Sequence, residues 1–491
     1  MAASAAPNPT VPWSIPVSST VITPASFEPL TAEDLTAVFR RSERPDQATH
    51  KVGTEQEKFG LFIDAAAGPR PVEYQAHVLP VLEAFVREFG WQPAADRGPG
   101  GEIIALERDG ASITLEPGGQ FELSGKPLPH IHATCAEFTQ HYHELHGVSQ
   151  RLGLAWLATG FHPFAVREEI NWMPKGRYAV MRAFLPTRGS KGIDMMLRTC
   201  TVQANFDFAS EQQAGERLRV AMGVSALSTA IFANSPYREG EDRGFASLRS
   251  DNWTDVDNSR CGLLPLAFEP GFHYERYVEW ALDVPMFFIR RDGQYVPLHL
   301  PFRVYMRDGF TAPDGTKHHA TRGDWDLHLS TLFPEIRLKP YLEVRGCDSV
   351  SSQFLCAMPA LWKGILYDEA ATQAAWELVS ELEFAERQAL WLECRQHAMR
   401  STRVQQLSAK LIAIARQGLD RQDVRDSKGR TEARFLDGIE ALVASGRSPA
   451  DLAREVLGPK PGRDAMARRA FMRHFHFAGA GLATETADPD A

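Results

Sequence analysis

The chain has 491 residues, of which 44% are hydrophobic and 23% charged, and its formal net charge is −9. This is ordinary globular composition for about two to four domain-sized units, with enough residues to bury a core without disulfides. The mild acidity argues against a nucleic-acid partner, and the lack of an apolar run of membrane length argues against a membrane-spanning protein.

The first 39 residues contain neither Lys nor Arg. They are therefore typical neither of a secretory signal nor of a transit peptide, and we expect residues 1–30 to be a loosely ordered lead-in. Six cysteines lie far apart and form no CxxC motif. This usage is typical of a reducing compartment with free thiols, so we predict a cytoplasmic protein.

Helical and strand patterns divide the chain at about residue 365. Thr31 precedes a predicted helix over 32–42, and Ser210 with Gln213 forms a capping box that begins another helix. From about residue 362, apolar residues recur at helical spacing and strand patterns stop. We predict a mixed body of helices and strands over 31–365 and a helical C-terminal subdomain over 366–491.

Four segments predict strands with one polar face. In 199–208, polar residues including Gln203 and Asn205 alternate with apolar ones, so all of them share one side. Residues 336–345 repeat this alternation, and 112–124 reads as two strands around a Pro-Gly-Gly turn. With segment 52–63, the polar face collects five acids and three cations: Glu55, Glu57, Glu116, Glu122 and Glu343, with Arg337, Lys339 and Arg345.

A sheet with one apolar and one polar face is commonly antiparallel, with helices on the apolar side. Carboxylates gathered on one face repel each other unless a cation neutralises them, and Mg²⁺ takes such oxygen ligands together with substrate phosphates. The pattern therefore indicates a platform for metal and nucleotide. The alternative is an ordinary solvent-exposed face with cross-strand charge pairs.

A basic segment at 173–182 supplies Lys175, Arg177 and Arg182, which could bind an anionic substrate, and Arg249 near Trp253 is a further candidate. An ordinary surface loop is the alternative for each. The chain contains no P-loop motif, so any ATP would bind by another device.

Several collinear segments between about 50 and 370 resemble the glutamate–cysteine ligase family of plants and many proteobacteria. They include Gly-Thr-Glu-Gln-Glu-Lys-Phe-Gly (53–60), Leu-Glu-Pro-Gly-Gly-Gln-Phe-Glu-Leu-Ser (115–124), Met-Pro-Lys-Gly-Arg-Tyr (173–178), Asp-Met-Met-Leu-Arg-Thr-Cys-Thr-Val-Gln-Ala-Asn (194–205) and Tyr-Leu-Glu-Val-Arg-Gly (341–346). The last hundred residues carry little signature.

The resemblance implies an α+β, glutamine-synthetase-like fold: an open antiparallel sheet with helices on its outer face and Mg²⁺ and ATP on its concave face. It also implies that 31–365 is the catalytic domain. In the implied reaction, ATP phosphorylates the side-chain carboxylate of L-glutamate, and the amine of L-cysteine then displaces phosphate. The product is γ-glutamylcysteine, the first intermediate of glutathione biosynthesis.

This chemistry assigns the residues to three groups. The metal ligands are Glu55, Glu57, Glu116, Glu122 and Glu343. The groups that contact the ATP phosphates or the transferring phosphoryl group are Arg337, Lys339 and Arg345, because anionic reactants need neutralisation rather than a covalent nucleophile. The substrate-binding residues are Lys175, Arg177, Arg182, Arg249, Gln203 and Asn205. The expected partners are L-glutamate, L-cysteine and ATP, with no nucleic acid or membrane, in a monomer or homodimer.

Cys135 and Cys356 lie in segments that resemble one redox-active cysteine pair of the plant proteins. The sequence leaves open whether they bond, and reduced thiols are the default expectation. The region 295–323, where a second pair would lie, contains no cysteine. Three rival functions remain: a ligase for another amine, a phosphagen-type kinase, and a non-catalytic binding protein. The intact set of five acids argues against the last.

Overall fold

The computed structural model describes residues 27–479, so most of the predicted lead-in lies outside the described residues. Its centre is a ten-stranded sheet in which every pairing is antiparallel. This confirms the α+β class and the antiparallel sheet. The strand order is β17 (Ile336–Leu338), β18 (Leu342–Asp348), β8 (Thr201–Phe206), β1 (Val52–Asp64), β6 (Phe121–Ser124), β5 (Ala111–Leu115), β4 (Ala105–Arg108) and β3 (Gln92–Pro93), with β2 (Gly68–Pro71) and β7 (Leu154–Leu157) on β1.

The central strand β1 changes partners halfway along its length. Residues 52–58 pair with β8 and β6, whereas 59–64 pair with β7 and β2. Gly60 lies just past the change, and a Cβ built there would be only 2.7 Å from the Trp156 ring of β7. A residue with a side chain would therefore force the strands apart at this point.

The predicted continuous strand over 336–345 is instead a tight hairpin of β17 and β18. Pro340 lies in the turn between them, where its missing N–H costs no ladder hydrogen bond. As a result, Arg337 lies directly opposite Glu343 across the hairpin rather than further along the same strand. The polar alternation was correct, but the chain reverses within it.

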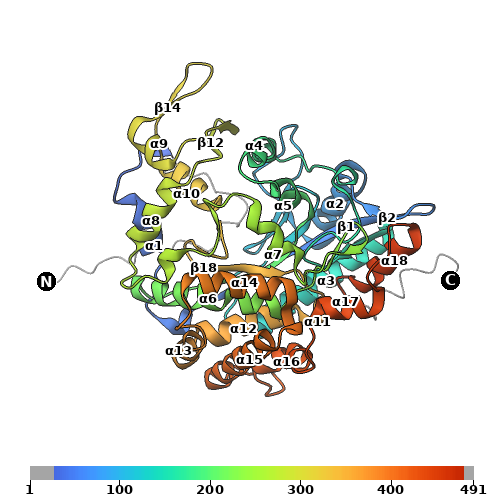
Figure 1. Cartoon of the computed structure of the whole chain (residues 1–491). Helices are drawn as coiled ribbons and strands as arrows, with labels where there is room; N and C mark the ends of the chain where they lie inside the picture. Colours follow the sequence, from blue (N-terminus) through green and yellow to red (C-terminus); the bar gives the residue numbers. More distant parts are fainter. Residues whose placement is uncertain (1–26, 480–491) are drawn as a thin grey trace.

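Helices cover the apolar face of the sheet. The most central is α6 (Glu211–Ile231), which begins at Ser210 as predicted, with the Ser210 side chain accepting from Gln213 N. Beyond Ala214 it is buried almost all round, because it lies between the sheet and the C-terminal helices. Figure 1 shows α12 (Ala357–Leu366) and α15 (Thr402–Gln422) below β18, with α4 (Gly176–Phe184) and β12 (Phe288–Arg291) above it.

The C-terminal part consists of helices, as the apolar spacing predicts, while the domain boundary at 365 stays a prediction. A buried ion pair joins it to the rest: Lys363 on α12 donates to Glu432, which also accepts from the backbone N–H of Ile131. No helix within residues 27–479 has the length and apolar character needed to cross a membrane. The helices of this C-terminal part are α13 (Glu369–Glu377), α14 (Phe384–His397), α15, α16 (Asp437–Ala444), α17 (Pro449–Leu457) and α18 (Ala465–His474).

Cys135 and Cys356 form a disulfide, which contradicts the expectation of free thiols at these positions. Cys135 lies in α3 (Ile131–Leu152) and Cys356 immediately precedes α12, and their Cα atoms are 5.9 Å apart. This distance is typical of a disulfide. Packing brings together two positions that are 221 residues apart in the chain, which spacing alone does not reveal. The other four cysteines are buried and free.

We predict that Cys135→Ser lowers the free energy of unfolding by about 2–4 kcal/mol in oxidising buffer, because the disulfide restricts the unfolded chain. Guanidinium denaturation followed by circular dichroism measures this difference. The control is the same pair of proteins in excess dithiothreitol, where the difference should vanish. A difference of equal size in both buffers would show that the serine, rather than the lost bond, is responsible.

Candidate active site

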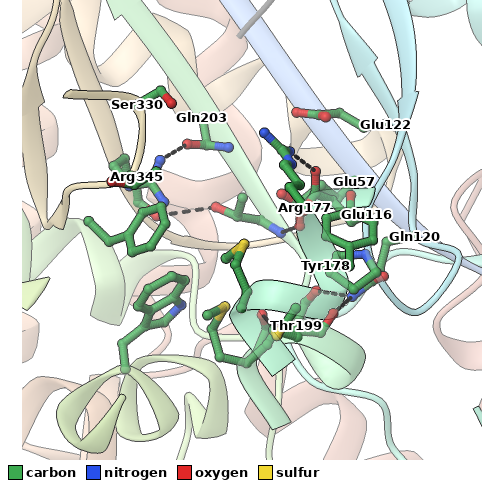
Figure 2. Close-up of a pocket in the computed structure, with 18 of the residues that line it drawn as sticks. Glu57, Glu116, Gln120, Glu122, Arg177, Tyr178, Thr199, Gln203, Ser330 and Arg345 are labelled. Carbon is green, nitrogen blue, oxygen red and sulfur yellow. Dashed lines mark hydrogen bonds and ion pairs between the residues drawn. The ribbon is translucent and has the colours of Figure 1, made fainter. Parts of the chain in front are cut away.

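One pocket opens on the polar face of the sheet. Its walls come from β1, β6, β8 and β18 and from three short helices, α4, α5 (Gly192–Arg198) and α7 (Leu248–Asn252). Figure 2 shows acidic side chains gathered around Arg177, with Arg345 on the opposite side. The pocket is lined by eight of the predicted residues: Glu57, Glu116, Glu122, Arg177, Gln203, Arg249, Arg337 and Arg345.

Strand geometry places the acids. Glu55 and Glu57 lie two residues apart on β1 and therefore share a face. The register pairs Glu57 with Glu122 on β6. Glu116 directly follows β5, and the turn back to β6 requires a positive φ of 83° at Gly119, which glycine adopts without strain. Three strands thus bring Glu57, Glu116 and Glu122 to one end of the pocket, with Glu55 next to them on the same sheet face.

Burial and mutual repulsion raise the pKa values of Glu55, Glu57 and Glu116. Burial raises the pKa of Glu55 to about 8, with Glu343 and Glu122 adding to the effect. Burial also raises the pKa of Glu57 well above its usual value, and the Glu122 and Glu116 charges act in the same direction. The pKa of Glu116 is raised by burial and by Glu122. The cationic side chains of the protein therefore do not fully neutralise the negative charge of these carboxylates.

Two buried oxygen atoms in this region lack partners. Within residues 27–479, no hydrogen-bond donor reaches Glu55 Oε2 or Asn205 Oδ1. The other Glu55 oxygen accepts from Asn205 Nδ2 at 2.7 Å, so each of the two side chains keeps one oxygen without a donor. Orphaned oxygen acceptors beside repelling carboxylates fit a hard divalent cation. In the same described range, however, no three acidic, His or Cys side chains already converge as a ligand set.

Glu343 has a different environment from the other acids. Burial alone would raise its pKa, but Arg337, Lys339 and Arg345 hold the pKa of this carboxyl well below its usual range. Arg337 donates to both oxygens, at 2.7 and 2.9 Å, and Arg345 Nη1 donates at 2.9 Å. Arg345 also donates to Gln203 Oε1 at 3.0 Å. Glu343 therefore anchors the cations predicted to contact phosphate.

Two arginines reach the pocket from short helices. Arg177 begins the first turn of α4, and its Nη2 lies 4.0 Å from Glu116 Oε1. The next residue, Tyr178, donates its hydroxyl to Leu115 O at 2.5 Å and so attaches α4 to β5. Arg249 lies on α7, and its Nη2 donates to the carbonyl oxygen of Arg345 at 2.8 Å.

Other predicted residues lie behind the pocket or away from it. Glu55, Asn205, Lys339 and Glu343 lie next to its lining residues on the same sheet face. Lys175 is buried beside Tyr178, and burial together with the Arg177 charge lowers its pKa to about 8. The structure does not bring Arg182 to this pocket. Its exposed guanidinium stacks 4.7 Å from the Trp172 ring and lines a separate pocket on the other side of α4.

Sequence patterns missed most of the helical wall. Met195, Met196 and Thr199 line the pocket from the end of α5, and Gln120 holds this end through hydrogen bonds to the carbonyls of Met196 and Thr199. Tyr178 and Met181 line it from α4. Alternation identifies the polar face of a strand, but it does not show which face of a short helix meets that strand.

The comparisons with known proteins identify the family of this chain. Residues 51–471 match the model of Glutamate-cysteine ligase family 2. Glutamate–cysteine ligase B, chloroplastic, of Oryza sativa subsp. japonica is 40% identical over 429 residues, which cover 86% of this chain and 83% of that protein. The chloroplastic enzyme of Nicotiana tabacum is 40% identical over 441 residues, covering 89% and 81%.

A solved structure supports the fold. The crystal structure of glutamate–cysteine ligase from Francisella tularensis in complex with AMP superposes with a TM-score of 0.50 at 14% identity, covering 89% of this chain and 91% of that one. The chain therefore belongs to glutamate–cysteine ligase family 2. Its activity is that of a glutamate–cysteine ligase, which performs the first step of glutathione synthesis.

We predict that Glu55→Gln stabilises the protein without ligands, most strongly at high pH. The folded state raises the pKa of Glu55 to about 8 from an ordinary 4.5, so ionising this group costs stability as the pH rises through that interval. Glutamine removes this cost. The gain in Tm, measured in EDTA, should grow from about pH 5 to pH 8 and then level off.

The matched control is Glu107→Gln on the exposed side of β4, which should leave Tm nearly unchanged at every pH. A destabilised Glu55→Gln variant, or a gain independent of pH, would contradict the assigned environment of Glu55.

Proposed function

We propose that this pocket joins the γ-carboxylate of L-glutamate to the amine of L-cysteine through a γ-glutamyl phosphate formed from ATP. One observation carries this proposal. Across a single pocket, arginines face carboxylates whose negative charge the protein does not fully neutralise. Phosphoryl transfer between anions depends on neutralisation and positioning more than on a covalent nucleophile, and both are available here. ATP enters the proposal because the family relative from Francisella tularensis is solved with AMP.

Mg²⁺ is the proposed metal, held by Glu55, Glu57, Glu116 and Glu122. The orphaned Glu55 oxygen and the raised pKa values of Glu55, Glu57 and Glu116 fit a hard cation. Because no three acidic, His or Cys side chains in residues 27–479 converge as a ready ligand set, phosphate oxygens and water would complete the coordination, as is usual for Mg²⁺. When bound, the metal would neutralise charge on the phosphates during transfer.

The cations divide between two tasks in this proposal. Arg345 and Lys339, held by Glu343, contact the phosphates of ATP, and Arg337 braces Glu343 from the opposite strand. Arg177 binds the transferring phosphoryl group, because it lies beside Glu116 at the acidic end of the pocket. Arg249 binds the α-carboxylate of L-glutamate. Its guanidinium lines the pocket and is held at the Arg345 carbonyl oxygen.

Three further expectations, on the fold family, the cellular location and the oligomeric state, stay proposals. The likeness of the sheet to the open bowl of glutamine synthetase is supported by its antiparallel order with helices on one face. A cytoplasmic location rests on the sequence composition alone. Assembly as a monomer or homodimer rests on the resemblance alone.

We predict that the acyl phosphate can be trapped. With ATP and L-glutamate but no L-cysteine, hydroxylamine should accept the γ-glutamyl group, giving γ-glutamyl hydroxamate and one phosphate for each ATP used. Mass spectrometry of the product and a phosphate assay measure the two. Glutaric acid, which lacks the α-amino group, is the control substrate. Hydroxamate formation without ATP, or phosphate release without hydroxamate, would contradict the proposed intermediate.

A second prediction compares two arginines on one helix. Arg177→Met should lower kcat/KM by at least about 100-fold, because it removes a preorganised cation from the transferring group. Arg182→Met should stay within about twofold of the parent, since Arg182 is exposed on the other side of α4. Steady-state phosphate release measures both. Similar losses in the two variants would show that α4 acts only as a structural element.

A further inference from the structure

A buried polar cluster lies behind Arg249, outside the pocket. Its centre is Asp348, the last residue of β18, whose side chain is completely buried. Three donors converge on its carboxylate: the backbone N–H of Asn234 at 2.8 Å, the Ser235 hydroxyl at 2.6 Å and the Ser247 hydroxyl at 2.7 Å. Burial raises the pKa of Asp348, whereas these donors and the nearby Arg249 charge favour its ionised form.

The two serines connect Asp348 to α7 by hydrogen bonds. Each hydroxyl has one proton, and both protons point to Asp348, so only oxygen lone pairs remain for other partners. Ser235 Oγ accepts from the backbone N–H of Arg249 at 3.3 Å. Ser247 Oγ accepts from Ser250 N at 3.0 Å as the N-cap of α7. The first turn of α7 is therefore attached to Asp348 through two hydroxyl groups.

The same strand also holds the other end of Arg249. Asp348 lies three residues beyond Arg345 on β18, and the Arg345 carbonyl oxygen accepts from Arg249 Nη2 at 2.8 Å. β18 thus fixes the backbone of Arg249 through Asp348 and its guanidinium through Arg345. Two attachment points on one strand leave a long, flexible side chain little freedom.

The cluster is packed without spare room. Gly160 lies against it, and a Cβ built at Gly160 would be 2.2 Å from the Asp348 carboxyl carbon. Gly160 N also donates to the carbonyl oxygen of Asn234, the residue whose own N–H reaches Asp348. A carboxylate enclosed in this way cannot swing to other partners.

We propose that Asp348, acting through Ser235 and Ser247, is a positioning residue that holds Arg249 for the carboxylate of L-glutamate. This inference rests on the proposed substrate role of Arg249. Neither Asp348 nor the two serines line the pocket, so their effect on the reaction passes through α7. A displaced guanidinium weakens binding of the amino acid while leaving ATP binding intact.

The test measures KM for L-glutamate, KM for ATP and kcat in Asp348→Asn, Ser235→Ala and Ser247→Ala. Ser408→Ala is the matched control, because Ser408 is also a fully buried serine but lies on α15, away from the site. Each of the three variants should raise KM for L-glutamate about tenfold, with kcat and KM for ATP within about twofold. Ser408→Ala should change none of them. Tm is recorded for all variants, and the serine variants serve if Asp348→Asn does not fold.

A double-mutant cycle with Arg249→Lys separates positioning from a general structural role. If Asp348 acts through Arg249, Asp348→Asn should cost less than about twofold further in the Arg249→Lys background, because the group that it positions is already lost. Three results would each overturn the inference. The first is a full tenfold loss on adding Asp348→Asn to the Arg249→Lys background. The others are equal rises in the KM values for ATP and L-glutamate, or no change in KM for L-glutamate, in the Asp348 and serine variants.

The Arg249→Lys single variant distinguishes a failure of the proposed substrate role of Arg249 from a failure of the positioning role of Asp348. If Arg249→Lys leaves KM for L-glutamate unchanged, the substrate role of Arg249 fails, and the inference fails with it. If Arg249→Lys raises this KM while the Asp348 and serine variants do not, only the positioning role fails.

Discussion

The mutual repulsion of buried carboxylates governs the organisation of this molecule. Five glutamates share the polar face of a sheet whose other face is packed against helices; Glu55, Glu122 and Glu343 are buried, and Glu57 and Glu116 are partly buried. Around Glu343 the protein supplies three cations and the carboxylate stays ionised. Around Glu55 and Glu57 it supplies too few, and the pKa values rise. Because the charges are compensated unevenly, the charge around Glu343 is neutralised within the protein. The region around Glu55 and Glu57 instead gains stability when a cation and an anionic substrate bind.

Strands and short helices contribute different parts of the site. The strands place the acids, because a register between paired strands fixes the distance between opposite side chains. Arg337 and Arg345 also come from strands, whereas Arg177 and Arg249 come from α4 and α7, short helices that have little stability of their own and depend on contacts with the sheet. Tyr178 attaches α4 to the carbonyl of Leu115, and the Ser247 cap attaches α7 to β18. Each helical arginine is thus held by a neighbour that does not itself carry charge.

The sequence was informative where chemistry follows a local period. The polar face of β8, the acids of β1 and the turn before β6 could all be predicted from alternation and glycine. The reversal at Pro340 was missed, because both arms of a hairpin can continue the same alternation. The position of Arg182 was missed, because residues five apart on a helix, such as Arg177 and Arg182, point to different sides, and nothing local shows which side meets the sheet. The bond between Cys135 and Cys356 depends on long-range packing, which no local pattern reveals.

The position of the last described helix has a consequence for synthesis of the chain. α18 packs on β2 and β7, which continue the second half of β1, and Phe471 shares an apolar cluster with Phe59 and Leu157. The strand that carries Glu55 and Glu57 is made early, but the α18 part of its cover is made much later. Until α18 has been made, the side of this apolar cluster that α18 covers lacks that cover. Contacts of such large sequence separation close late, so the nascent chain is open to chaperones and to aggregation until α18 has emerged.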